Sequence, residues 1–143
     1  MKIEWSTFVR SVEGEDDSMV IHGPGMDSVL AKWLPVDVEI WMTVCLRTDF
    51  REFEDPTDNV LRAEIKEPQE RELVGWWTWT MGAPRIASDL YQEGHSGHQV
   101  KAFLLKFHAE TEGWYDVELS VNGGEIYLCH LRVAPKPESF QTQ

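Results

Sequence analysis

The chain has 143 residues, of which 42% are hydrophobic and 27% are charged, and its formal net charge is −12. This length fits one domain with a core of its own, and the hydrophobic content excludes a chain that is disordered throughout. The negative charge, without a visible basic patch, argues against binding to nucleic acid or to an anionic membrane surface.

Strand patterns recur along the chain with turn signals between them. The alternation of apolar and polar residues predicts strands at Lys2 to Val9, Met19 to His22, Val36 to Arg47, Val60 to Lys66, Leu73 to Met81 and Gln99 to His108, and a hairpin over residues 112–133. The Asn122-Gly123-Gly124 turn divides that hairpin, and its apolar residues keep one phase on either side. Between the first two strands lies an acidic turn at residues 13–17.

The segment Val36 to Arg47 carries the strongest strand signal. All six of its even positions are apolar, which is too regular for a helix and predicts the central strand. The long connection from Gly82 to His98 contains Ile86 to Gln92, where one or two helical turns are expected. About eight short strands with one apolar face each predict an all-β protein, an antiparallel β-sandwich, with a closed barrel as the alternative.

The sandwich domain is expected to span residues 1–134. The prolines in Ala134-Pro135-Lys136-Pro137 lack backbone donors, so residues 135–143 are expected to form a flexible tail.

No segment signals a membrane span or a leader. No run approaches the ~20 apolar residues that a spanning helix needs, and residues 1–10 alternate in polarity where a signal peptide has an apolar stretch. Two cysteines, Cys45 and Cys129, are fewer than a small secreted domain usually carries. We therefore expect a cytoplasmic protein. Whether the two thiols lie near each other stays open, because it depends on which strands are neighbours.

Four segments give the chain a resemblance to a known family. They are Met19 to Val29 with its Gly23-Pro24-Gly25 turn, the Leu34-Pro35 pair, the Gly82-Ala83-Pro84 loop and the stretch from Glu112 to Gly124. Together they resemble a family of small bacterial proteins, common in actinobacteria, that has an immunoglobulin-like β-sandwich and no known function. The resemblance implies this fold over nearly the whole chain, and it implies no active site.

Tyr115 has a predicted role within that fold. The Gly113-Trp114-Tyr115 sequence resembles the tyrosine corner of immunoglobulin-like sandwiches, in which a tyrosine hydroxyl bonds to nearby backbone. Tyr115 also shares its phase with Val117 and Leu119, so its ring is expected to be buried.

The tryptophans are the first candidate binding residues. Trp77 and Trp79 share a phase with Leu73 and Met81 and are expected to fill the core. Trp41 and Trp76 lie in the opposite phases of their strands. If both are exposed, they favour a patch for a protein partner, and a platform for sugar rings is the alternative.

Metal-binding candidates are weaker. His95 and His98 are three residues apart, a spacing that zinc sites use, but the sequence has neither a cysteine pair nor a His-Glu-x-x-His motif. The acidic stretches at 13–17 and 49–58 lack the spacing of a calcium loop. They are expected to be solvated turns.

The sequence therefore favours a non-catalytic module for protein interaction or assembly, without a cofactor, whose partner is another protein or a second copy of the chain. No nucleophile, phosphate-binding or dinucleotide-binding motif is present. Two alternatives stay open: binding of a carbohydrate or small ligand through an exposed tryptophan, and a metal-dependent enzyme that uses His95 and His98.

Overall fold

The computed structural model describes residues 1–14, 19–49, 52, 57–81 and 96–137, and every element that lies wholly within them is a strand. The ten strands are β1 (Lys2–Val9), β2 (Ser11–Glu13), β3 (Val20–His22), β4 (Ser28–Ala31), β5 (Val36–Asp49), β6 (Val60–Lys66), β7 (Leu73–Thr80), β8 (Ser96–Ala109), β9 (Gly113–Val121) and β10 (Tyr127–Pro135). The predicted all-β fold is confirmed. In the described part of the chain, no helix is long and apolar enough to cross a bilayer.

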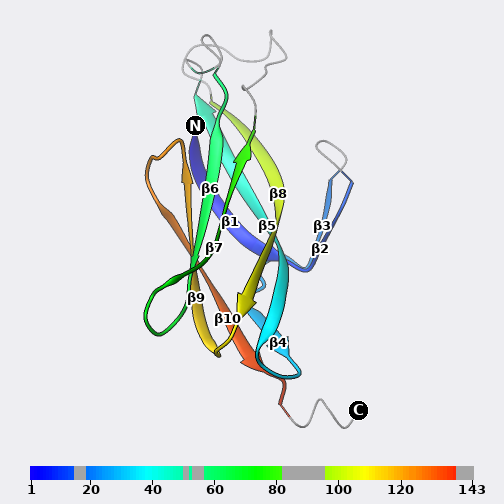
Figure 1. Cartoon of the computed structure of the whole chain (residues 1–143). Coiled ribbons are helices and arrows are strands. Elements are labelled where there is room, and N and C mark those ends of the chain that lie inside the picture. The colour runs from blue at the N-terminus through cyan, green and yellow to red at the C-terminus, as the bar shows by residue number, and fades with distance from the viewer. Residues whose placement is uncertain (15–18, 50–51, 53–56, 82–95, 138–143) are drawn as a thin grey trace.

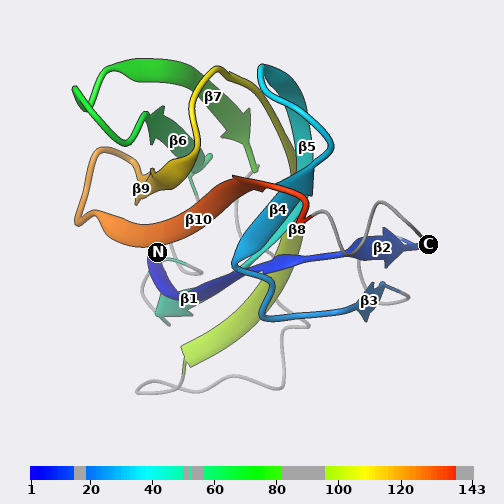
Figure 2. The same cartoon turned by 90° about the horizontal axis from the view of Figure 1, so that it is seen from below.

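Two sheets face each other and enclose one core (Figure 1). The first has the order β1-β5-β8 and the second the order β4-β10-β9-β6-β7. The short β2–β3 hairpin projects from this body, as both views show (Figure 2). Separate sheets with a shared interior confirm the sandwich over the barrel.

The strand order is that of the immunoglobulin fold. In that fold strands A, B and E share one sheet, and strands G, F, C and C′ share the other. Here β1, β5 and β8 correspond to strands A, B and E. In the other sheet, β10, β9, β6 and β7 correspond to strands G, F, C and C′. The sheets are not purely antiparallel, because β4 pairs with β10 in parallel register.

The core consists of the apolar faces that the alternation predicted. On β5, the side chains of Val38, Ile40, Met42, Val44 and Leu46 are all buried. They meet the inward residues of β6, β9 and β10, among which Leu61, Ile65, Leu119 and Leu131 are fully buried.

The tyrosine corner and the terminal turn also form as predicted. Tyr115 is 1% exposed, and its hydroxyl donates a hydrogen bond of 2.7 Å to the carbonyl of Thr111. At the turn, Asn122 and Gly123 have φ values of +52° and +70°. Gly124 donates its N–H to the Val121 carbonyl over 2.9 Å and closes a β-turn whose two central residues are both left-handed, while the ladder of β9 with β10 begins at Leu119 and Tyr127.

Some predicted boundaries were wrong. Ser11–Glu13 forms β2 where part of an acidic turn was expected, and Ser28–Ala31 forms the unpredicted strand β4. Strand β8 begins at Ser96, so Gly97 and His98 belong to a strand and not to the preceding connection. Strand β2 forms a local hairpin with β3, whereas β4 and the start of β8 form ladders with the distant strands β10 and β5, which outweigh weak local strand propensity. The helical turns expected at Ile86 to Gln92 lie outside the described residues.

The C-terminal strand continues one residue past the expected domain boundary. Pro135 pairs with Ala31 of β4, and Lys136 donates its N–H to the Ala31 carbonyl over 2.7 Å. The remainder of the expected tail lies largely outside the described residues.

Candidate functional site

Trp76 lies on the outer face of the five-stranded sheet. It belongs to β7, the last strand of that sheet, and is 54% exposed. The guanidinium carbon of Arg62 lies 4.8 Å from the centre of its indole ring, a cation–π contact. Arg62 in turn donates hydrogen bonds to Glu64 from Nε and Nη2, at 3.1 and 2.9 Å. The indole is therefore exposed to solvent, but it also contacts the guanidinium of Arg62 on the neighbouring strand β6.

Ion pairs cross the rest of this face. Lys66 Nζ lies 2.6 Å from the carboxylate of Glu118, and this carboxylate raises the pKa of the lysine. Asp116 is buried, and its two oxygens contact Arg71 on one side and His130 on the other, the latter at 2.7 Å. Because each carboxylate has a cation or histidine beside it, the acidic side chains of this face are locally balanced.

Further apolar side chains are exposed on the same outer face. Trp114 on β9 and Leu128 on β10 are 49% and 48% exposed. Leu128 pairs with Glu118, Glu118 pairs with Glu64, and Glu64 pairs with Trp76. These four residues therefore form one row across the sheet, with Leu128 and Trp76 at its ends. We call the surface formed by these side chains the Trp76 face; its residues are Arg62, Glu64, Trp76, Trp114, Glu118 and Leu128. Exposed aromatic residues among paired charges are typical of protein-binding surfaces.

Within the described residues, one edge of β7 has no strand partner, and we call it the open edge. Strand β7 pairs with β6, and no other described strand pairs with it. Met81 donates its N–H to the carbonyl of Asn59 over 2.8 Å. Bonded pairs alternate along an antiparallel ladder, so the odd-numbered residues 75, 77 and 79 point their backbone groups toward β6. The backbone groups of Trp76, Thr78 and Thr80 therefore point to the open edge.

The open edge has no charged side chain. From Leu73 to Met81 the sequence contains no acidic or basic residue, and β7 is the longest described strand of which this is true. Proteins usually protect an edge strand with lysine, proline or a charge that points inward. The register shift beside Lys66 interrupts pairing near Val74, but Gly75 to Thr80 pair regularly with β6.

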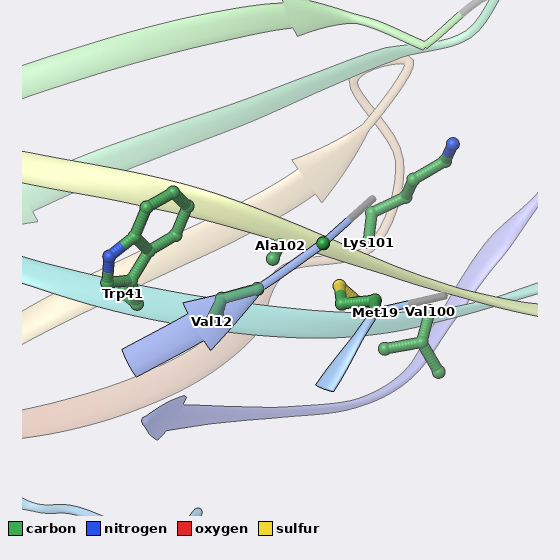
Figure 3. Close-up of a pocket in the computed structure, with 7 residues that line it drawn as sticks. Val12, Met19, Trp41, Val100, Lys101 and Ala102 are labelled. Atoms are coloured by element: carbon green, nitrogen blue, oxygen red, sulfur yellow. The ribbon is translucent and has the colours of Figure 1, made fainter. Parts of the chain in front are cut away.

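Trp41 lines a cleft on the opposite side of the sandwich. It lies on the outer face of β5 and is half-buried. A cleft of about 280 Å³ separates the β2–β3 hairpin from this sheet. Figure 3 shows Val12 and Met19 of the hairpin opposite Trp41, Val100 and Ala102. This volume lies just below the usual range for small-molecule pockets.

The structure does not bring Trp41 and Trp76 together. They lie on the outer faces of different sheets, and Trp41 is half-buried, so the condition on which a shared patch was expected, exposure of both tryptophans, is not met. Trp77 and Trp79 point inward and pack against the core, as predicted, and the Trp79 ring lies 4.5 Å from that of Phe103.

The described residues give no support to a metal site. His98 is exposed on β8 and lies 3.9 Å from Glu4, while His95 falls outside the described residues. No group of three or more histidine, cysteine, aspartate or glutamate side chains in the described ranges is arranged to hold a metal ion. The acidic stretches at 13–17 and 49–58 are largely outside those ranges.

Arg62, Thr78 and the open edge were not predicted from the sequence. The phase of Arg62 was visible, because it alternates with the buried Leu61 and Ala63. The lack of charge in residues 73–81 was visible too. Neither signal reveals that β7 ends its sheet, since that depends on the order of distant strands.

The two cysteines are unpaired and lie in different sheets, Cys45 on β5 and Cys129 on β10. Burial raises the pKa of both thiols, and nearby Glu4 raises that of Cys45 further. Less thiolate therefore exists at neutral pH than for a free cysteine. We expect both to react slowly with a colorimetric disulfide reagent at pH 7.5, and at the ordinary rate once the chain is unfolded in guanidinium. Fast reaction of either thiol in the folded chain would contradict its burial.

Compared with known proteins, the chain matches no family model and no curated protein sequence. Its resemblance to a bacterial family of unknown function therefore stays a prediction from the residues.

Proposed function

We propose that the chain is a non-catalytic protein-interaction module that binds its partner through the Trp76 face and the open edge of β7. The observation that supports this most directly concerns the edge strand β7. Among the described strands it pairs on one side only, it carries no charged residue, and its Trp76 is exposed. An extended segment of a partner can extend the sheet there by backbone hydrogen bonds, a common mode of peptide recognition.

Trp76 supplies the side-chain part of this surface. Tryptophan and arginine are enriched among the residues that dominate binding free energies, and here Arg62 stacks on the tryptophan. The paired charges around them favour a polar rim that selects orientation. Two unpaired thiols support a cytoplasmic site of action, and the net charge of −12 argues against a nucleic-acid partner.

The substitution Trp76→Ala tests the proposal, with Trp41→Ala as the matched control on the other sheet. Tagged chains carrying each change would be used to capture partners from cells of the native host, and hydrogen exchange would then map the protected amides. We expect Trp76→Ala to weaken partner binding at least about tenfold, as loss of a central aromatic contact does. Trp41→Ala should retain the partner, and protection should fall on β7.

Two results would contradict the proposal. One is a bound protein that survives Trp76→Ala and protects amides away from β7. The other is a bound molecule lost only with Trp41→Ala, which would favour the small-ligand alternative, with the cleft of about 280 Å³ as its site.

A further inference from the structure

We infer that the strand which pairs with the open edge of β7 is the β7 strand of a second copy of the same chain. This inference rests on the proposed function and names the partner of that surface. The two copies would be related by a two-fold axis, so that their five-stranded sheets join into one continuous sheet across the β7 strands.

Charge is the first argument for a second copy. Two chains of net charge −12 repel each other over most of their surfaces. The strand from Leu73 to Thr80 carries no charge, so two copies can meet there without opposing like charges directly. A partner selected for positive charge would instead need carboxylates along this edge, and the edge strand has none. The open edge is therefore suited to its own copy.

The register of the edge is the second argument. Antiparallel pairing centred on Trp77 places Trp76 of one copy opposite Thr78 of the other, and the same pair recurs by symmetry. Both residues point their backbone groups to the open edge, as the Met81–Asn59 hydrogen bond establishes. Each such pair can exchange two N–H to carbonyl bonds. This register pairs Gly75 to Trp79 of the two copies with one another, within the stretch of β7 that pairs regularly with β6.

The side chains fit this register on the outer face. Trp76 and Thr78 are both exposed in the single chain, so no core residue has to move. Aromatic and β-branched residues form favourable cross-strand pairs. Two such pairs would lie side by side at the centre of the dimer interface. In each chain, Arg62 would keep its cation–π contact with Trp76.

The salt dependence distinguishes a second copy from a basic partner. Between two acidic chains the long-range interaction is repulsive, and salt screens it. Dimerisation should therefore strengthen as NaCl is raised from about 50 mM to about 500 mM. A positively charged partner would be released over the same range.

The substitution Thr78→Glu tests the dimer interface, and Ser120→Glu is its matched control. Both residues lie directly opposite Arg62 on the outer face, one on β7 and the other on the interior strand β9. Each change adds one carboxylate beside the same arginine, but only Thr78→Glu adds it at the open edge. Thermal unfolding of both variants would show that each is folded.

Sedimentation velocity over a range of concentrations would measure dimerisation. We expect the unmodified chain to populate dimers at about 100 μM, as do other small interfaces. Thr78→Glu should weaken dimerisation at least about tenfold, and Ser120→Glu should leave it within a factor of about two. Independently of any variant, hydrogen exchange at low and high concentration should show protection of the Trp76 and Thr78 amides on dimerisation.

Three results would overturn the inference: an unmodified chain that stays monomeric at this concentration, a dimer that Thr78→Glu leaves intact, or equal weakening by both variants. If the unmodified chain is monomeric while a different protein binds it and is lost with Thr78→Glu, the proposed function stands and the second copy is excluded. If no protein of either kind needs the β7 edge, both fail.

Discussion

Replacing Gly113 with alanine is expected to lower the free energy of unfolding by about 2–4 kcal/mol. Gly113 begins β9 with a φ of +138°, a conformation that side chains rarely adopt. A Cβ there would lie 2.8 Å from both Cβ and Cγ of Pro68 in the β6–β7 turn. The alanine would therefore strain its own backbone and displace the turn that packs on it.

Two further variants separate these causes. Gly25 has a φ of +81°, and no atom lies within 4 Å of the position its Cβ would take. Gly25→Ala therefore lowers stability through backbone strain alone. Pro68→Ala in the Gly113→Ala background should recover part of the loss, which a double-mutant cycle by urea unfolding would measure. Equal losses for Gly25→Ala and Gly113→Ala, with no coupling to Pro68, would contradict the packing argument.

Replacing Tyr115 with phenylalanine is expected to cost about 1–3 kcal/mol of stability. The ring stays in place, packed 5.2 Å from that of Phe107, but the hydrogen bond of its hydroxyl to the Thr111 carbonyl is lost. Because Tyr115 is 1% exposed and its bond to Thr111 is partly buried, water replaces that donor only in part. The carbonyl loses its partner, and loss of a partner at a buried group costs more than the net value of a typical hydrogen bond.

Tyr127 provides the control for this substitution. It is a half-buried tyrosine at the margin of the core, and Tyr127→Phe removes the same hydroxyl from a more accessible position. We expect that change to alter stability by less than about 0.5 kcal/mol. Urea unfolding curves of both variants would test the difference. A Tyr115→Phe variant as stable as the parent chain would show that the corner contributes nothing to the fold.

Much of the fold was predictable because its signals are local. The alternation along β5 and the Asn122-Gly123 turn each specify a backbone period or conformation within a few residues. The tyrosine corner was predicted from the phase of Tyr115 together with the Gly113-Trp114-Tyr115 motif. By contrast, Ser28–Ala31 is four residues long, and it forms a strand because its parallel register with β10 satisfies its backbone groups. No local pattern indicates such a partner.

The candidate site was predictable to a similar extent. Phase alone placed Trp76 on the face opposite that of Trp77, and the structure exposes Trp76 and packs the partly buried Trp77 against the core. What the sequence could not indicate is that β7 ends its sheet, because the order of β9, β6 and β7 results from packing of the whole chain. The separation of Trp41 from Trp76 has the same origin, since it depends on which sheet each strand joins.

The stacking of Arg62 on Trp76 has a consequence for how this surface recognises a partner. An exposed tryptophan normally samples several rotamers, and ordering it on association has an entropic cost. Here the guanidinium, itself bonded to Glu64, holds the indole before any partner arrives. Much of that ordering is therefore completed when the chain folds, and Trp76 begins each encounter in a preorganised orientation.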